Sequence, residues 1–459
     1  MCPVTMSFLS PEEIAAARPL PPPPPPEQSM LDIARERMIA TGQWRPGQAM
    51  GRRFPVGCVA LEITQRCNLD CTLCYLSENS EAVLDLPLEE IYRRIDMIHT
   101  LYGPLTEVQV TGGDPTLRKR AELVEIVRRI RARGMRPALF TNGIRATRDL
   151  LAELAAAGLV DVAFHVDTTQ QRQGYVSESE LNPVRREYIE RARGLNLSVF
   201  FNTTVHQGNF GEIPEVARFF VAHADIVRLA SFQLQADTGR GLFHGRSALI
   251  TPDTVARQIT AGAGSPIRFD TPGIGHRDCN RYATTLVVNG RAHDLYDNPG
   301  LINEFLDASV NLDYDRTRPG RAVRTLMRWL LANPRFLWRG APWGVGKLWA
   351  MKADLIAGRG RVHKLSFFIH NFMDACRLDR QRIEACVFMA VTANGPISMC
   401  LHNAKRDSFI LQPVKLETAT GERLWDPLRG PEGGSAVIRK VPAKGRAAAR
   451  RLPSGKPTR

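Results

Sequence analysis

The sequence predicts an α/β protein built on parallel strands. Between Cys58 and Leu234, short apolar runs alternate with segments of helical periodicity, at intervals of roughly 25 to 40 residues. Glycine or small polar residues follow the runs and mark where each strand ends. Parallel strands need long crossover connections, and helices of this length supply them. The alternation is compatible with a Rossmann-type sheet or with a barrel.

Each predicted element is a short stretch with one dominant periodicity. The strands are Cys58–Ile63, Glu107–Thr111, Arg136–Thr141, Val160–Val166, Leu197–Thr203 and Ile226–Leu234. The helices are Leu88–Leu101, Arg120–Arg133, Asp149–Ala157, Pro183–Gly194 and Ile213–Ala224, with a short amphipathic helix at Met30–Thr41 before them.

The 459 residues are enough for one large domain with extensions. The domains expected are a disordered proline-rich arm (1–30), a helix and loop (31–56), the α/β core (57–236), a mixed α+β extension (237–437) and a disordered basic tail (438–459). Nine cysteines in a chain of this length are too few for a disulfide framework and indicate reduced thiols in the cytosol. No secretory signal or membrane span is apparent.

Three cysteines, Cys67, Cys71 and Cys74, lie within eight residues after the first strand, spaced C-x3-C-x2-C. Iron–sulfur clusters are held by thiolates, and a cubane takes four ligands, so three thiols leave one iron open to a substrate or cofactor. The adjacent Tyr75 can pack over that cofactor. A zinc knuckle and incidental cysteines are the alternatives. We call residues 67–75 the cysteine loop.

This loop resembles the motif of the radical S-adenosylmethionine (SAM) enzymes, which carry an aromatic residue just before the third cysteine. Here Leu73 holds that position, and Tyr75 follows Cys74. The resemblance implies a partial (β/α)6 barrel, a [4Fe–4S] cluster, SAM, and a reductant such as ferredoxin or flavodoxin. It also implies reductive cleavage of SAM to a 5′-deoxyadenosyl radical, which abstracts hydrogen from an unactivated C–H bond.

In such barrels the chemistry lies at the C-terminal ends of the strands, where the remaining motifs fall. Gly112-Gly113-Asp114-Pro115 is similar to the GGEP motif of the family and is expected to hold the methionine part of SAM. Asn142, Asp167 and Asn202 are further candidates for SAM, although polar residues at strand ends often only cap helices. His165 is expected to be a hydrogen-bonded core residue rather than a catalytic one.

Four further cysteines, Cys279, Cys376, Cys386 and Cys400, form a candidate set for an auxiliary [4Fe–4S] cluster. A hairpin predicted at Asn394-Gly395 would bring Cys386 and Cys400 together. Cys279 is far away in sequence, and His276 could replace it. A zinc site or buried free thiols are the alternatives. The region resembles the auxiliary-cluster extensions of the molybdenum-cofactor cyclase and of the tetraether lipid synthase branch.

Residues 321–351, here the basic–aromatic segment, combine tryptophans with six basic residues, and Pro334 and Pro342 are expected to break it into short helices. Such composition suits either a peripheral membrane contact or a packed helical insertion with a solvated face. His402, Lys405, Arg406 and Asp407 could bind an anionic group or form a solvated charged turn.

The leading hypothesis is a cytoplasmic radical SAM enzyme, membrane-associated if the segment binds lipid, acting on a small molecule or lipid. A peptide-modifying radical SAM enzyme is the second hypothesis, and an iron–sulfur electron carrier or scaffold is the third. Eight of the fourteen net positive charges lie in Arg439–Arg459, so the charge says little about the active site, and no nucleic acid partner is expected.

Overall fold

The computed structural model describes residues 8–20, 28–241, 247–418 and 421–431. Six parallel strands alternate with helices through the first half of the chain, as predicted. The strands are β1 (Cys58–Thr64), β2 (Glu107–Gly112), β3 (Arg136–Thr141), β4 (Asp161–His165), β5 (Ser198–Val205) and β6 (Val227–Leu234). The helices are α3 (Leu88–Tyr102), α4 (Arg120–Ala132), α5 (Arg148–Ala156), α6 (Asn182–Ala192) and α7 (Ile213–Ala222).

The C-terminal half adds two more parallel strands to this core. β9 (Val362–Asn371) pairs with β6, and β10 (Phe388–Thr392) pairs with β1, so the parallel order is β10-β1-β2-β3-β4-β5-β6-β9. Phe388 on β10 lies 6.0 Å from Phe368 and 5.0 Å from His370 on β9, measured between ring centroids. The two ends of the series therefore face each other, and the strands curve into a barrel closed at this seam by side chains.

Antiparallel strands continue the sheet on both sides of the seam. β7 (Asn280–Val288) pairs with β9 and with β8 (Arg291–Asp294), and β11 (Gly395–Ser398) forms the predicted hairpin with β10. β12 (Val414–Thr418), β13 (Gly421–Asp426) and β14 (Gly430–Pro431) make a separate small sheet. The extension expected after residue 236 is thus partly built into the barrel wall.

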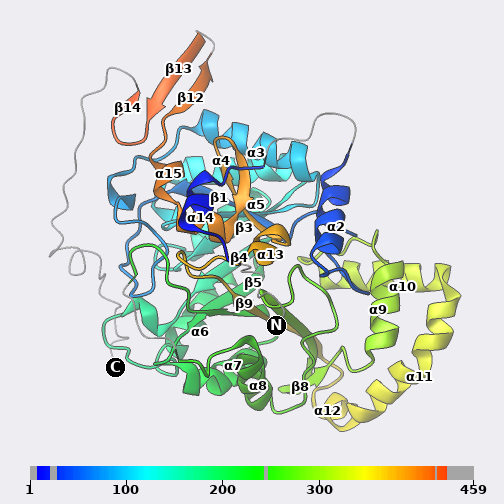
Figure 1. Ribbon diagram of the computed structural model, residues 1–459. Helices are drawn as coiled ribbons and strands as arrows, with labels where there is room; N and C mark the ends of the chain where they lie inside the picture. Colours follow the sequence, from blue (N-terminus) through cyan, green and yellow to red (C-terminus); the bar gives the residue numbers. More distant parts are fainter. Residues whose placement is uncertain (1–7, 21–27, 242–246, 419–420, 432–459) are drawn as a thin grey trace, which may run out of the picture.

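The core lies between the outer face of the strands and the helices. Alternate residues of a strand face opposite sides, so Val108 and Val110 of β2 are fully buried outwards, whereas Gln109 and Thr111 face the barrel interior. Helix α3 presents Ile91, Ile95 and Ile98 on one face, all at most 1% exposed. Figure 1 shows the barrel strands with α3 to α7 around them.

A group of helices lies beside the barrel, at the lower right of Figure 1. It consists of α9 (Pro299–Ala308), α10 (Pro319–Ala332), α11 (Pro334–Ala350) and α12 (Lys352–Ala357). Pro334 begins α11, as expected, but Pro342 lies inside α11 and does not end it, which corrects that expectation. A proline in a helix interior removes one hydrogen bond, and the remaining turns carry the helix past it.

The remaining helices are short or peripheral: α2 (Met30–Ala40), α8 (Pro252–Ala263), α13 (Arg380–Glu384), α14 (Met399–Ala404), α15 (Asp407–Ile410), and the single turns η1 (Ser80–Ala82), η2 (Pro115–Leu117), η3 (Thr168–Gln170) and η4 (Phe210–Glu212). In the part of the chain described above, no helix has the length and apolar character needed to cross a bilayer.

The expected disordered arm is wrong for residues 8–20. They contain α1 (Pro11–Ala16), which is closed by a capping box from Ser10 and Glu13. Lys405 holds this helix by donating to the carbonyls of Ala15 and Ala17, each at 2.7 Å. The proline run 21–26 and the basic tail 438–459 lie outside the described residues.

Candidate functional site

The three cysteines of the cysteine loop gather at the C-terminal mouth of the barrel. Burial raises the pKa of Cys71 well above its usual value, and the neighbouring thiols of Cys74 and Cys67 raise it further. Burial likewise raises the pKa of Cys67 to about 12, with Asp114 the next contributor. Thiols that perturb one another in this way lie close together, and all three line the same cavity.

The donor set fits an iron–sulfur cubane. Three soft thiol ligands converge from one loop, and a cubane spreads its thiolates over different irons. Among the residues for which coordinates are described, no group of three or more His, Cys, Asp or Glu side chains is placed to hold a single metal ion, as a zinc knuckle would require.

The glycine turn, residues 112–114, lies directly against the segment that leads into Cys67. Gly113 donates to the carbonyl of Thr64 at 2.9 Å, and Asp114 donates to that of Arg66 at 2.8 Å. A Cβ on Gly113 would stand 2.0 Å from the Arg66 carbonyl oxygen, so only glycine fits there. Gly112 and Gly113 both line the cavity, which places the turn beside the predicted SAM position.

Asp114 itself does not reach the cavity, and its predicted contact with SAM is corrected. Its carboxylate is fully buried and accepts hydrogen bonds from the backbone of Thr116 and of Asn142 and from the hydroxyls of Thr116 and Thr141. With its lone pairs occupied, it ties the end of β2 to the end of β3 and does not bind an ammonium group.

Asp167 repeats this arrangement two strands further along, so the prediction for it is also corrected. Its buried carboxylate accepts from the backbone and hydroxyl of Thr169, from the Thr204 backbone at 2.7 Å and from His165 Nε2 at 2.6 Å. The carboxylate therefore joins the ends of β4 and β5. It also fixes His165, which faces the cavity as a hydrogen-bonded side chain.

Three other predicted SAM residues do line the cavity. Asn142 donates to Asn68 of the cysteine loop at 2.7 Å, and Asn202 faces the cavity from β5. Tyr75 donates from its hydroxyl to the Gly112 carbonyl at 2.5 Å. The phenol thus links the cysteine loop to the glycine turn, and its ring packs under the Arg406 guanidinium at 4.7 Å.

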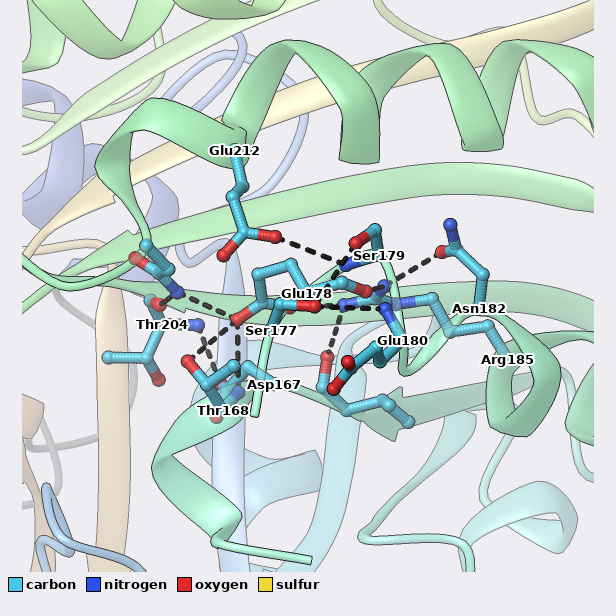
Figure 2. A network of polar contacts seen from close by, with 12 residues as sticks. Asp167, Thr168, Ser177, Glu178, Ser179, Glu180, Asn182, Arg185, Thr204 and Glu212 are labelled. Carbon is cyan, nitrogen blue, oxygen red and sulfur yellow. Dashed lines mark hydrogen bonds and ion pairs between the residues drawn. The ribbon is translucent and has the colours of Figure 1, made fainter. Parts of the chain in front are cut away.

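A buried network behind the Asp167 turn was not predicted (Figure 2). Glu178 accepts from the Thr168 backbone at 2.9 Å, from its hydroxyl at 3.0 Å and from Asn209 at 2.8 Å. Arg185 pairs with the Glu178 carboxylate, and both side chains are fully buried. Since Thr169 accepts from the Thr72 backbone at 2.9 Å, this network holds the strand end on which the cysteine loop rests.

Gly239, Arg240 and Gly241 cover the other side of the cysteine loop, a contact that local sequence patterns did not suggest. Arg240 donates from its backbone to Leu76, and Gly241 donates to the Cys74 carbonyl at 3.0 Å. The Arg240 side chain is 3% exposed and lies near Asp70 and Glu81. Burial lowers the pKa of Arg240, but Cys74 and these two carboxylates outweigh burial and raise it. A cation therefore stands next to the predicted cluster.

Residues 402–407 make contacts within the protein, and His402 and Arg406 also line the cavity. Arg406 pairs with the buried Glu62 at 2.7 Å, and Asp407 accepts from Asn79 at 2.7 Å. His402 is 4% exposed and stacks on Phe409.

The structure brings together three of the four predicted auxiliary cysteines. Burial raises the pKa of Cys400 to about 12, and the nearby thiols of Cys386 and Cys279 contribute to the rise. Arg382 donates to the sulfur of Cys279 at 3.2 Å. Cys376 is exposed and stands apart, so it, rather than Cys279, is the outlier of the predicted set. His276 is buried beside Cys279, whose amide donates to its carbonyl.

A cavity of about 1230 Å³ extends from the cysteine loop along the barrel axis. This is larger than the roughly 300 to 1000 Å³ of common ligand sites. Barrel interiors are usually filled by bulky side chains. Here small residues face inward at mid-barrel, among them Ala60, Ala163, Ser231 and Ala390. At the far end the cavity is bounded by α9 and α10 through residues such as Phe305, Leu306, Val323 and Leu326.

Comparison with known proteins places the barrel in a family. Residues 61–220 match the sequence profile of the Radical SAM superfamily. The chain is 30% identical over 186 residues to a 7,8-dihydro-6-hydroxymethylpterin dimethyltransferase of Methanocaldococcus jannaschii, covering 39% of this chain and 36% of that protein.

Two further relatives match the same region. A probable GTP 3′,8-cyclase of Pyrococcus abyssi is 34% identical, with 36% of this chain and 53% of the relative covered. A PqqA peptide cyclase of Bradyrhizobium diazoefficiens is 30% identical, with 38% and 46% covered. The chain thus spans about a third to a half of the length of these relatives. Residues 61–220, which contain the cysteine loop and strands β2 to β5, thus match the radical SAM superfamily, whose cofactors are a [4Fe–4S] cluster and S-adenosylmethionine.

Proposed function

We propose that this protein is a radical SAM enzyme that removes a hydrogen atom from an unactivated C–H bond of a lipid or another hydrophobic molecule. The cavity is the observation that carries the proposal. It joins the three thiols of the cysteine loop to an interior lined mainly by apolar side chains. When bound, the cluster and SAM supply the 5′-deoxyadenosyl radical, and the chain positions them and excludes water.

In this proposal some residues hold the cofactors and others shield them from water. Cys67, Cys71 and Cys74 would hold the cluster, and Gly112, Gly113, Asn142 and Asn202 would contact SAM. Asp114 and Asp167 fix the strand ends from which these groups project. The enclosing wall formed by β9 and β10 keeps bulk water from the reacting atoms.

An auxiliary cluster on Cys279, Cys386 and Cys400 is part of the proposal. The buried Cys400 and the half-buried Cys279 and Cys386 lie near the Arg382 guanidinium, which already donates to the Cys279 sulfur. Hydrogen bonds to cluster sulfurs are one of the means by which proteins set a reduction potential.

The proposal also includes contact with a membrane surface through α10 to α12. Eight of the fifteen large apolar side chains left exposed in the described residues lie there: Val323, Met327, Leu331, Trp338, Val345, Leu348, Trp349 and Ile356. Residues 316–353 contain nine Arg or Lys and no Asp or Glu. Exposed tryptophans among basic residues suit the interface of an anionic bilayer.

A peptide-modifying radical SAM enzyme is the second candidate, favoured by the similarity to a protein whose name is PqqA peptide cyclase. An electron carrier or scaffold is the third, and the large cavity beside the cysteines argues against it, since neither role needs one.

The test is anaerobic incubation of the reconstituted protein with SAM and dithionite. We expect 5′-deoxyadenosine from the wild type and none from Cys67→Ala, Cys71→Ala or Cys74→Ala. Absence of 5′-deoxyadenosine from an iron-loaded wild-type protein would refute the enzymatic proposal and leave the carrier. Deuterium transfer into 5′-deoxyadenosine from deuterated lipid extract, but not from deuterated peptides, would separate the first two candidates.

A further inference from the structure

A polar cluster lies in the cavity at the end remote from the cysteine loop. Ser366 Oγ accepts from Lys364 Nζ at 2.8 Å and from the Tyr282 hydroxyl at 2.8 Å, and it lies 3.0 Å from the Thr284 hydroxyl. Lys364, Ser366 and Tyr282 all line the cavity. Nothing in the chemistry proposed above uses these groups.

Lys364 is the one cation of this cluster, and no acidic partner lies within ion-pair distance of it among the described residues. Two arginines of the same cavity are neutralised by carboxylates: Arg316 pairs with Glu107 and Asp161 at 3.0 and 2.9 Å, and Arg136 pairs with Asp313. Arg228, beside Leu229 on β6, instead donates to the carbonyls of Ala224 and Asp225. An ammonium has three N–H donors, and Lys364 uses one on Ser366. The Lys364 side chain is exposed where it lines the cavity, so the other two donors face water that an anionic ligand can replace.

The surroundings of Lys364 restrict what that ligand can be. Leu229, Leu286 and Phe368 line the cavity near it, on β6, β7 and β9. Along β9, Lys364 and His370 are six residues apart, which corresponds to about 20 Å of strand. A ligand that meets both the cation and the SAM position therefore has an anionic group at one end and a long apolar body.

We infer that Lys364, supported by Ser366 and Tyr282, binds the anionic group of an amphiphilic substrate, a phosphate or a carboxylate, with the apolar chain directed along the barrel axis towards the cysteine loop. This inference rests on the proposed function. It also sets the direction of entry, because Val323 and Leu326 of α10 border the same end of the cavity. The apolar part of the ligand enters first, and its anionic group stays beside α10, on the side that is proposed to contact the membrane.

The test is calorimetric binding to the full-length, cluster-loaded protein, using dodecyl phosphate, dodecanol and inorganic phosphate below micellar concentrations. A charged hydrogen bond should make dodecyl phosphate bind at least about tenfold more tightly than dodecanol. Lys364→Met should remove that preference, and Lys364→Arg should retain it. Lys415→Met, an exposed lysine on the small β12–β13 sheet, is the matched control and should change nothing.

Two outcomes would overturn the inference. One is an unchanged preference in Lys364→Met. The other is inorganic phosphate binding as tightly as dodecyl phosphate, which would indicate a site for a free anion. Formation of 5′-deoxyadenosine by the wild type, measured in parallel, separates this result from the fate of the proposed function, since ligand binding and SAM cleavage are measured independently.

Discussion

Single side chains at the strand ends of this barrel serve mainly to hold the cofactor loops in place. Asp114 and Asp167 stand two strands apart and form the same set of hydrogen bonds, each to a threonine two residues ahead and to the backbone at the end of the next strand. The Asp-x-Thr spacing is a known local turn. Whether such a carboxylate faces a ligand or the next strand depends on tertiary contacts, so the sequence could not decide between a SAM contact and the capping role that Asp167 has.

Glu62 offers a test of this holding role through pH. Burial raises its pKa, but the Arg406 guanidinium and His402 outweigh burial and hold the pKa at about 2, below the ordinary 4.5. A group with a depressed pKa in the folded state stabilises the protein fully above its unfolded pKa and loses that effect as pH falls towards the folded value. Glu62→Gln should therefore lower the free energy of unfolding by about 3 kcal/mol at pH 7.

The difference should shrink below pH 4.5, because the unfolded carboxylate becomes protonated there while the folded one stays ionised until about pH 2. Urea unfolding of the metal-free protein at several pH values measures it. Glu422→Gln is the control, because its pair with Lys415 is about 70% exposed on both sides and should contribute at most about 1 kcal/mol. A Glu62→Gln effect that does not vary between pH 7 and pH 3 would contradict the assignment.

Single substitutions can show which of the auxiliary cysteines bind the proposed cluster. Because Cys400 is buried beside Cys279 and Cys386, Cys400→Ala should lose about half of the iron and sulfide of the reconstituted protein. Cys376→Ala should keep it, since Cys376 is exposed and apart. Iron and sulfide analysis of each variant measures this. Equal iron content in the wild type and in all variants would show that these cysteines are free thiols and hold no cluster.

At the scale of elements, the sequence predicted the first six strands and their helices because each has a clear local period. It did not predict that β9 and β10 join the same barrel. β9 follows β6 only after more than a hundred residues that contain β7, β8 and five helices, and strand pairing over such a separation leaves no local pattern. Likewise Gly239-Arg240-Gly241 reads only as a turn, although it covers the cysteine loop.

The helices α10 to α12 carry a prediction of their own. Trp338→Ser together with Trp349→Ser should reduce co-sedimentation with vesicles of phosphatidylcholine and phosphatidylglycerol at least about tenfold, because these side chains are 79% and 70% exposed. Arg324→Ser with Arg328→Ser should weaken binding mainly at low salt. Val176→Ser with Leu249→Ser, equally exposed but elsewhere, is the matched control. If only the control pair lost vesicle binding, the membrane contact would lie outside α10 to α12.

At the scale of the whole molecule, the open interior is the property on which the proposed function depends. At mid-barrel, small inward-facing residues such as Ala163 alternate with bulky ones such as Phe140 and Phe200 on the neighbouring strands. Ser231, 3% exposed on β6, is one of the small residues.

Filling this position should separate cofactor chemistry from substrate binding. Ser231→Phe should keep its iron and still form 5′-deoxyadenosine, while dodecyl phosphate binds at least about tenfold more weakly. Ser231→Ala, which removes the hydroxyl without adding volume, should bind as the wild type does. Equal binding by both variants would show that the chain does not pass mid-barrel.

The ordered arm at the start of the chain has a consequence for electron supply. Leu9, Ile14 and Ala17 pack against the group that contains Cys400, Met373 and Leu378. An apolar cover controls how much water reaches a metal centre, and hydration shifts its redox potential. Removal of α1 and the residues beside it in 8–20 should therefore admit water to the proposed auxiliary cluster and shift its reduction potential. This short segment would then serve as an apolar shield over the proposed cluster.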